Sequence, residues 1–204
     1  CGIIESYSGN KNINLSTRYH NPLSGSLSAS GSGSINFVEG QASISTQYND
    51  VGEISLTVND TGNEMSGNSN QFIVTPTDFS IAVSDNPSTT SNGEGFIPAG
   101  DEFTVNVQAL NAEGNPTPNY GNEQNPESVS VVLDSLVFPT GGNVGILSNR
   151  ESFTRLSDNL FQNNALSWNE VGSIRLTAAV GDGDYLGTGN VTSAESSTVG
   201  RFYP

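Results

Sequence analysis

One ten-residue pattern occurs twice in the chain, and this repeat constrains the fold more than any other feature of the sequence. The first copy is Tyr48-Asn-Asp-Val-Gly-Glu-Ile-Ser-Leu-Thr57, and the second is Trp168-Asn-Glu-Val-Gly-Ser-Ile-Arg-Leu-Thr177. Both copies read aromatic, Asn, acid, Val, Gly, any, Ile, any, Leu, Thr. They lie about one domain length apart, which is typical of a repeated structural unit. The sequence therefore predicts two copies of one kind of domain.

Apolar residues alternate with polar ones along several short stretches, which indicates β-strands with one buried face. Turn-forming clusters such as Glu113-Gly114-Asn115-Pro116 separate these stretches. Short strands punctuated in this way are typical of antiparallel sandwiches. The predicted fold class is all-β, with tandem immunoglobulin-like antiparallel β-sandwiches. The alternating positions are Ile54, Leu56 and Val58, then Phe79, Ile81 and Val83, then Phe103, Val105, Val107 and Ala109, and finally Ile174, Leu176, Ala178 and Val180.

The repeated pattern fits a turn that leads into a late strand of each sandwich. Its acid is expected to accept backbone N–H bonds, and its glycine to adopt a φ that other residues avoid. The domain boundary is predicted near residues 74 to 76, with no flexible linker, so the two units should swivel little. Residues 1–74 then form a first immunoglobulin-like sandwich, short for a complete copy, and 75–204 form the second. Equivalent buried positions are expected at Val51, Ile54 and Leu56, and at Val171, Ile174 and Leu176.

The charge balance excludes several classes of partner. Acids outnumber bases 21 to 6, which gives a formal net charge of −15. Nucleic acids and anionic membranes require a basic face, so neither is an expected partner. No apolar stretch reaches the roughly 18 residues of a membrane span, and the first residues lack the pattern of a signal peptide.

Catalytic chemistry is not expected from the sequence. His20 is the single histidine, Cys1 is the single cysteine, and the chain has no Gly-x-Ser-x-Gly element. Zinc sites need several His or Cys ligands, so a standard zinc site is excluded. Glycoside hydrolysis uses a pair of carboxylates that come together only in the fold, so the sequence leaves an enzyme of this kind open as a third hypothesis, behind the two non-enzymatic ones described below. Whether Cys1 forms a disulfide is left open by the sequence.

Two loops contain the candidate binding residues. Calcium takes oxygen ligands, and Asp182 and Asp184 in the loop 181–190 are the candidate metal ligands, with no other cofactor expected. Tyr120 and Tyr185 lie in turn-rich segments and are predicted to be exposed contact residues. Because end loops vary over a rigid scaffold, the loops 111–124 and 181–190 are expected to make contacts without being needed for the fold.

Several segments resemble the repeated immunoglobulin-like modules of the MshQ family, which is associated with the mannose-sensitive haemagglutinin (MSHA) type IV pilus. These segments are the two acid-Val-Gly-x-Ile-x-Leu-Thr patterns, Ala99-Gly-Asp-Glu-Phe-Thr-Val-Asn-Val-Gln-Ala109, Gly114-Asn-Pro-Thr-Pro-Asn-Tyr-Gly121 and Thr198-Val-Gly-Arg-Phe-Tyr-Pro204. The resemblance implies an extracellular protein at the cell surface, outer membrane or pilus of a Gram-negative bacterium. It supplies no catalytic or ligand-binding residues.

The leading hypothesis is a non-enzymatic structural and adhesion module that acts as spacer and interaction surface. Its expected partners are other domains of the parent surface protein, pilus components or surface glycans, without nucleic acid and without insertion into a membrane. The alternative is a carbohydrate-binding module of an adhesin or of a secreted glycan-active protein. Binding of the fragment to a glycan array would separate these two hypotheses.

Overall fold

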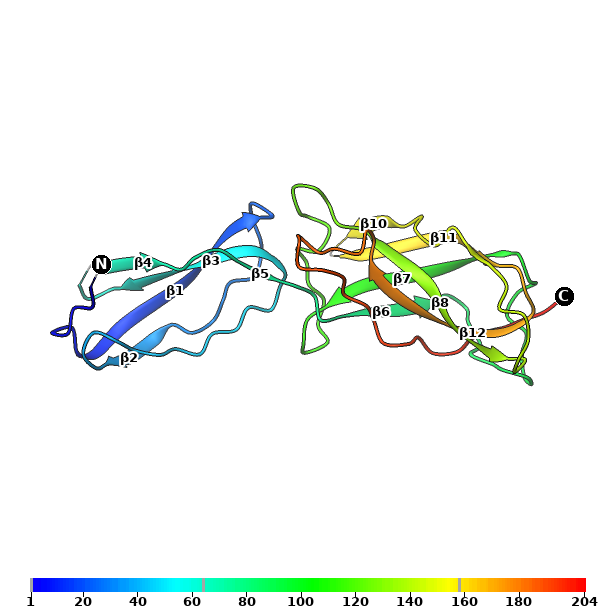
Figure 1. Ribbon diagram of the computed structural model, residues 1–204, viewed down its shortest axis with the longest axis horizontal. Coiled ribbons are helices and arrows are strands. Elements are labelled where there is room, and N and C mark those ends of the chain that lie inside the picture. Colours follow the sequence, from blue (N-terminus) through cyan, green and yellow to red (C-terminus); the bar gives the residue numbers. More distant parts are fainter. Residues whose placement is uncertain (1, 64, 158) are drawn as a thin grey trace.

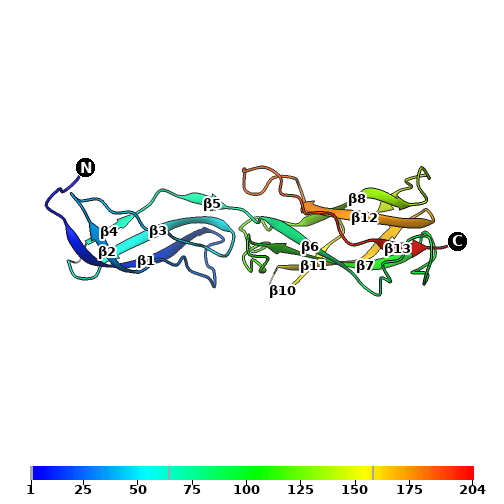
Figure 2. The same ribbon diagram turned by 90° about the horizontal axis from the view of Figure 1, so that it is seen from below.

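The computed structural model describes residues 2–63, 65–157 and 159–204, and all of its regular structure is β-strand. Cys1 and its redox state lie outside the described residues. The named strands pair antiparallel in every case, so the predicted all-β class is confirmed. Figures 1 and 2 show two bodies placed end to end, joined by the short segment between β5 and β6.

The first body is built on one sheet, with strand order β2-β1-β3-β4 and with β5 also paired to β3. No second sheet faces it among the described residues, in contrast to the sandwich expected for 1–74. Instead, the irregular segment that contains Ala29 packs on β1, where the Ala29 amide donates to Thr17 Oγ1 at 2.7 Å. The strands are β1 (Gly9–Asn21), β2 (Gly33–Phe37), β3 (Gly52–Asp60), β4 (Met65–Asn68) and β5 (Phe72–Val74).

The second body is a sandwich of two antiparallel sheets. One sheet has the order β10-β11-β7-β6, with β9 also paired to β11, and the other has the order β13-β12-β8. Buried residues from both sheets form one hydrophobic core, and the alternation predicted along β7 and β12 is observed. The strands are β6 (Asp78–Val83), β7 (Glu102–Leu110), β8 (Val129–Phe138), β9 (Leu147–Ser148), β10 (Thr154–Ser157), β11 (Leu160–Trp168), β12 (Gly172–Val180) and β13 (Val199–Phe202).

The two copies of the repeated pattern occupy equivalent places. β3 and β12 begin at Gly52 and Gly172, whose φ angles are 124° and 122°. At each glycine a Cβ would collide with a carbonyl oxygen that precedes a proline, that of Asn21 or that of Phe138. Only glycine lacks the Cβ that would collide, which explains why both copies of the pattern have glycine at this position. The strand sets β1-β3-β5 and β8-β12-β13 therefore correspond.

Burial at the repeated positions agrees with the prediction at four sites and not at two. Val51, Ile54, Ile174 and Leu176 are fully buried. Leu56 is only half-buried, because the first body has one sheet to cover it. Val171 is also half-buried, and it lies at the end of the second body that no neighbour covers.

Replacing Leu176 with Ala is expected to lower the free energy of unfolding by about 2–5 kcal/mol, because the truncation leaves a cavity in a close-packed core. Denaturant unfolding of the purified chain measures this change. The control is Leu156→Ala at a side chain that is 53% exposed on β10, for which a change within about 0.5 kcal/mol is expected. Equal losses from the two variants would contradict the assigned core.

Candidate functional site

Tyr120 and Tyr185 lie in the core of the second body, so the prediction that they are exposed contact residues is wrong. Both side chains are 0% exposed, and their rings stack with centroids 5.6 Å apart and an interplanar angle of 13°. The Tyr120 hydroxyl donates to the Ser128 carbonyl at 2.7 Å, and the Tyr185 hydroxyl donates to Glu123 Oε1 at 2.9 Å. Burying an aromatic ring while satisfying its hydroxyl stabilises this end of the sandwich.

The loop 181–190 is consequently part of the fold and not a dispensable contact loop. It inserts Tyr185 between Tyr120 and the carboxyl group of Glu123, which is itself 3% exposed. Deleting the loop would uncover this carboxyl group and one face of the Tyr120 ring. Polar, glycine-rich surroundings suggested exposure for both tyrosines, and only the long-range contacts show their burial.

Asp182 and Asp184 use their carboxylates to shape the turn in this loop. Asp182 Oδ1 accepts the Asp184 amide at 2.9 Å, and Asp184 Oδ1 accepts the Gly189 amide at 2.7 Å. Within the described ranges, no group of three or more His, Cys, Asp or Glu side chains is arranged to hold a metal ion. Calcium binding here stays a prediction, for which a rise of Tm with added calcium is the direct measurement.

A group of acids lies beside the tyrosine pair. Glu123 Oε2 accepts the Glu127 amide at 3.1 Å, and burial raises the pKa of the Glu123 carboxyl. Burial also raises the pKa of Glu127 to about 7, and the negative charges of Asp182, Glu123 and Asp184 add to the increase. These carboxyl groups oppose one another when all are ionised.

His20 lies within hydrogen-bond reach of Ser55 and Gln71, and its tautomer decides which of the two ring nitrogens donates. Gln71 Nε2 lies 3.1 Å from His20 Nδ1, and His20 Nε2 lies 2.9 Å from Ser55 Oγ. With the Gln71 amide donating to Nδ1, the ring proton is on Nε2, which then donates to the serine. A general base would need the opposite tautomer, oriented by an acceptor at Nδ1.

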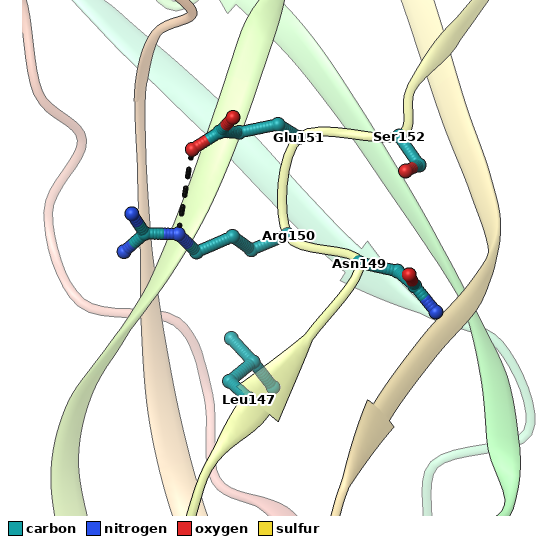
Figure 3. A pocket seen from close by; sticks show the side chains of 5 residues that line it. All are labelled: Leu147, Asn149, Arg150, Glu151 and Ser152. Carbon is teal, nitrogen blue, oxygen red and sulfur yellow. Dashed lines mark ion pairs between the residues drawn. The ribbon is translucent and has the colours of Figure 1, made fainter.

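An open hollow of about 280 Å³ lies beside β9, and Figure 3 shows the side chains that line it. Its lining includes an ion pair between Arg150 Nε and Glu151 Oε1 at 3.4 Å, with side chains that are 55% and 65% exposed. Ion pairs this exposed add little stability, and water screens their charges. The hollow therefore lacks the buried, convergent polar groups of a typical ligand site. Its lining residues are Leu147, Asn149, Arg150, Glu151 and Ser152.

A buried polar site does exist, at the junction between the two bodies. Asp50, the acid of the first repeated pattern, is 1% exposed, and its Oδ1 accepts the amides of Val51 at 2.9 Å and Asn119 at 3.0 Å. Asn119 Nδ2 donates to the Val51 carbonyl at 3.2 Å and to the Tyr48 hydroxyl oxygen at 3.1 Å. Burial raises the pKa of Asp50, while the two amides oppose that rise. One turn of the second body is thus fixed to the repeated pattern of the first.

Further contacts surround this site. The Gln124 amide donates to Asn21 Oδ1 at 2.8 Å, and Asn111 Nδ2 donates to the Asn49 carbonyl at 3.1 Å. The side chain of Val51 belongs to the hydrophobic core of the second body, although the residue precedes β3 of the first. The centre of the junction is therefore buried, and hydrogen bonds between the two bodies surround it. The acid was identified from the sequence as a turn residue, but its partner Asn119 was missed, because nothing in the sequence links the two positions.

Glu127→Gln tests the acid group through the dependence of stability on pH. A carboxyl whose pKa is 4.5 when unfolded and about 7 when folded stabilises the fold below pH 4.5, and this contribution is lost as the pH rises through 7. The wild-type Tm should therefore fall over this range more than the Tm of the variant, which should be the more stable protein at pH 8. The exposed Glu151→Gln is the matched control and should follow the wild type. Parallel curves for wild type and Glu127→Gln would contradict the assignment.

Two family models match parts of the chain. Residues 75–170 match the model of the second domain of DUF6701, and residues 170–204 match that of its third domain. Searches of curated proteins and of solved structures gave no match. Among the described residues no helix has the length and apolar character needed to cross a membrane. The border between the two models falls between β11 and β12, inside one sandwich. Over its second body, the chain is thus similar to DUF6701 from the second domain into the third.

Proposed function

We propose that the chain is a non-enzymatic structural and adhesion module whose two bodies form a stiff spacer with an interaction surface. The observation that carries this proposal is the junction, where a buried carboxylate, an amide side chain and a shared core residue join the bodies. A flexible connector would place polar, solvated residues there. Here β5 ends at Val74 and β6 begins at Asp78, which leaves little chain to swivel.

The setting proposed for this spacer is the outside of a Gram-negative bacterium, in an MshQ-like protein associated with the pilus. The support is the resemblance of the two repeated patterns and of the segments 99–109, 114–121 and 198–204 to the modules of that family. The proposed partners are other domains of the parent protein, pilus components or surface glycans. A net charge of −15 favours solubility and disfavours contact with anionic surfaces.

Two features of the structure support a role without catalysis. The His20 ring is hydrogen-bonded to Gln71 and Ser55, and neither partner is a carboxylate of the kind that orients a general-base histidine. The hollow of Figure 3 is lined by an exposed ion pair. Stacking of a sugar on an exposed aromatic ring is a separate possibility. Tyr120 and Tyr185 were the expected contact residues, but their side chains are fully buried, as is that of Trp168. A glycan array measures sugar binding through any other surface, and a bound glycan would favour the carbohydrate-binding alternative over the spacer.

Asn119→Ala tests the stiffness of the junction. The variant removes the bonds to Tyr48 and Val51, so docking should weaken by about 1–3 kcal/mol while both bodies stay folded. Spin labels at the exposed positions Ser34 and Thr154, in a chain with Cys1→Ser, report the distance between the bodies. The wild-type distribution should be narrow and that of the variant broad.

Asn122→Ala is the matched control for this experiment. Asn122 belongs to the same loop, but its side chain donates to Pro118 within the second body. Its distribution should equal that of the wild type. A wild-type distribution as broad as that of Asn119→Ala would mean that the junction is a hinge, and the spacer proposal would be wrong.

A further inference from the structure

The repeated pattern occurs a second time at the far end of the second body, where no neighbour covers it (Figure 1). In the first copy, Asp50 and Val51 are 1% and 0% exposed, because the second body is seated on them. In the second copy, the matching Glu170 and Val171 are only half-buried. The two local patterns are similar, and only the first has a neighbouring unit seated on it.

The local geometry of the two ends is alike in the parts that receive the neighbour. Glu170 Oε1 accepts the Val171 amide at 3.1 Å, as Asp50 Oδ1 accepts the Val51 amide at 2.9 Å. β13 pairs Phe202 with Gly172, as β5 pairs Val74 with Gly52. The residues that follow, Tyr203-Pro204 and Thr75-Pro76, place a proline at the same distance from each glycine pair.

An apolar hollow of about 190 Å³ lies at this far end. Tyr203 and Phe138, which both line it, are 39% and 37% exposed, so the hollow gathers two partly exposed aromatic side chains at this end. At the equivalent place in the first body, beside Asn21, the loop of Asn119 and Gln124 covers the surface. The lining of the hollow includes Phe138, Pro139, Val171, Gly172, Phe202 and Tyr203.

We propose that the far end is a docking site for one further β-sandwich unit of the same kind as residues 78–204. The turn of that unit which carries the counterpart of Asn119 sits on Glu170 and Val171, as Asn119 sits on Asp50 and Val51. This inference rests on the proposed spacer function, and it names the partner that binds the end of the spacer farthest from the first body. The Asn119 turn of this chain is already in contact with the first body. The docking unit must therefore be a different copy, in which the equivalent turn has no such neighbour.

One difference predicts that the second junction is weaker than the first. Trp168 replaces Tyr48, and its Nε1 donates to the Val144 carbonyl inside the second body. The counterpart of Asn119 in the docking unit can therefore donate to the Val171 carbonyl. It has no counterpart of the Tyr48 hydroxyl, which is the second acceptor at the first junction. On the other side, Arg201 lines the hollow, but its Nη2 donates to the Gly93 carbonyl at 3.1 Å and its Nε is buried, so the incoming unit does not reach Nε.

The test uses the full chain extended at Pro204 by a second copy of residues 77–204, so that the new connection repeats the Pro76–Thr77 connection. Hydrogen exchange is followed at the amide of Val171. Docking should slow this exchange at least about tenfold relative to the 204-residue chain, because the amide becomes shielded. Equal exchange in the two chains would overturn the proposal.

Variants separate docking from general stabilisation. Asn119→Ala in the appended copy alone should restore most of the original exchange rate, whereas Asn122→Ala in the same copy should not. Val171→Asp changes a half-exposed side chain, so the second body stays folded, and spin labels on the second and third units should then show a broad distance distribution. No response to any of these variants would overturn the proposal.

The native junction is measured in the same extended chain. A narrow distance distribution at the native junction with a broad one at the new junction means that the docking inference fails and the spacer function stands. A broad distribution at the native junction means that the spacer function itself fails.

Discussion

The burial of the Asp50 carboxylate against Asn119 is the interaction on which the arrangement of the whole molecule depends. A buried carboxylate is costly unless hydrogen bonds replace its water, and here the amides of Val51 and Asn119 do so at Oδ1, while Oδ2 is buried without a partner among the described residues. Separating the bodies would remove the Asn119 amide and bring Val51 out of the second core. The two units therefore lose polar and apolar contacts together when they part, which favours a single relative orientation over a range of them.

The first body has a particular reason to depend on this contact. Its strands form one sheet, and its buried apolar residues are few: Ile13, Leu15, Ala29, Val51 and Ile54. A small core buries too little apolar surface to be stable with much margin. Val51 extends that core into the larger one of the second body, where Tyr120, Tyr185 and Trp168 are buried. The stability of the first body therefore depends in part on its contact with the second body.

Local patterns allowed the fold class and the repeated turn to be predicted, since alternation along β7 and β12 and a glycine with positive φ leave direct marks in the sequence. The site could not be predicted in the same way. Tyr120 and Tyr185 lie among polar residues, and their burial follows from a stack between loops distant in sequence. The sequence identified Asp50 as an acid in a turn, but its second hydrogen bond comes from the Asn119 amide of the other body. The missing information was long-range in each case.

The path of the chain through the strands has a mechanical consequence. In the first body the entering strand β1 and the leaving strand β5 both pair with β3, and the strands run broadly along the long axis of the molecule (Figures 1 and 2). Antiparallel hydrogen bonds lie across the strands, so tension between the two ends acts sideways on the long β1–β3 ladder and on the short β3–β5 ladder, and loads the bonds of each ladder together. A protein pulled in this direction resists by shear and does not unzip bond by bond. The strand pairing of the first body is thus suited to bearing load along the molecule.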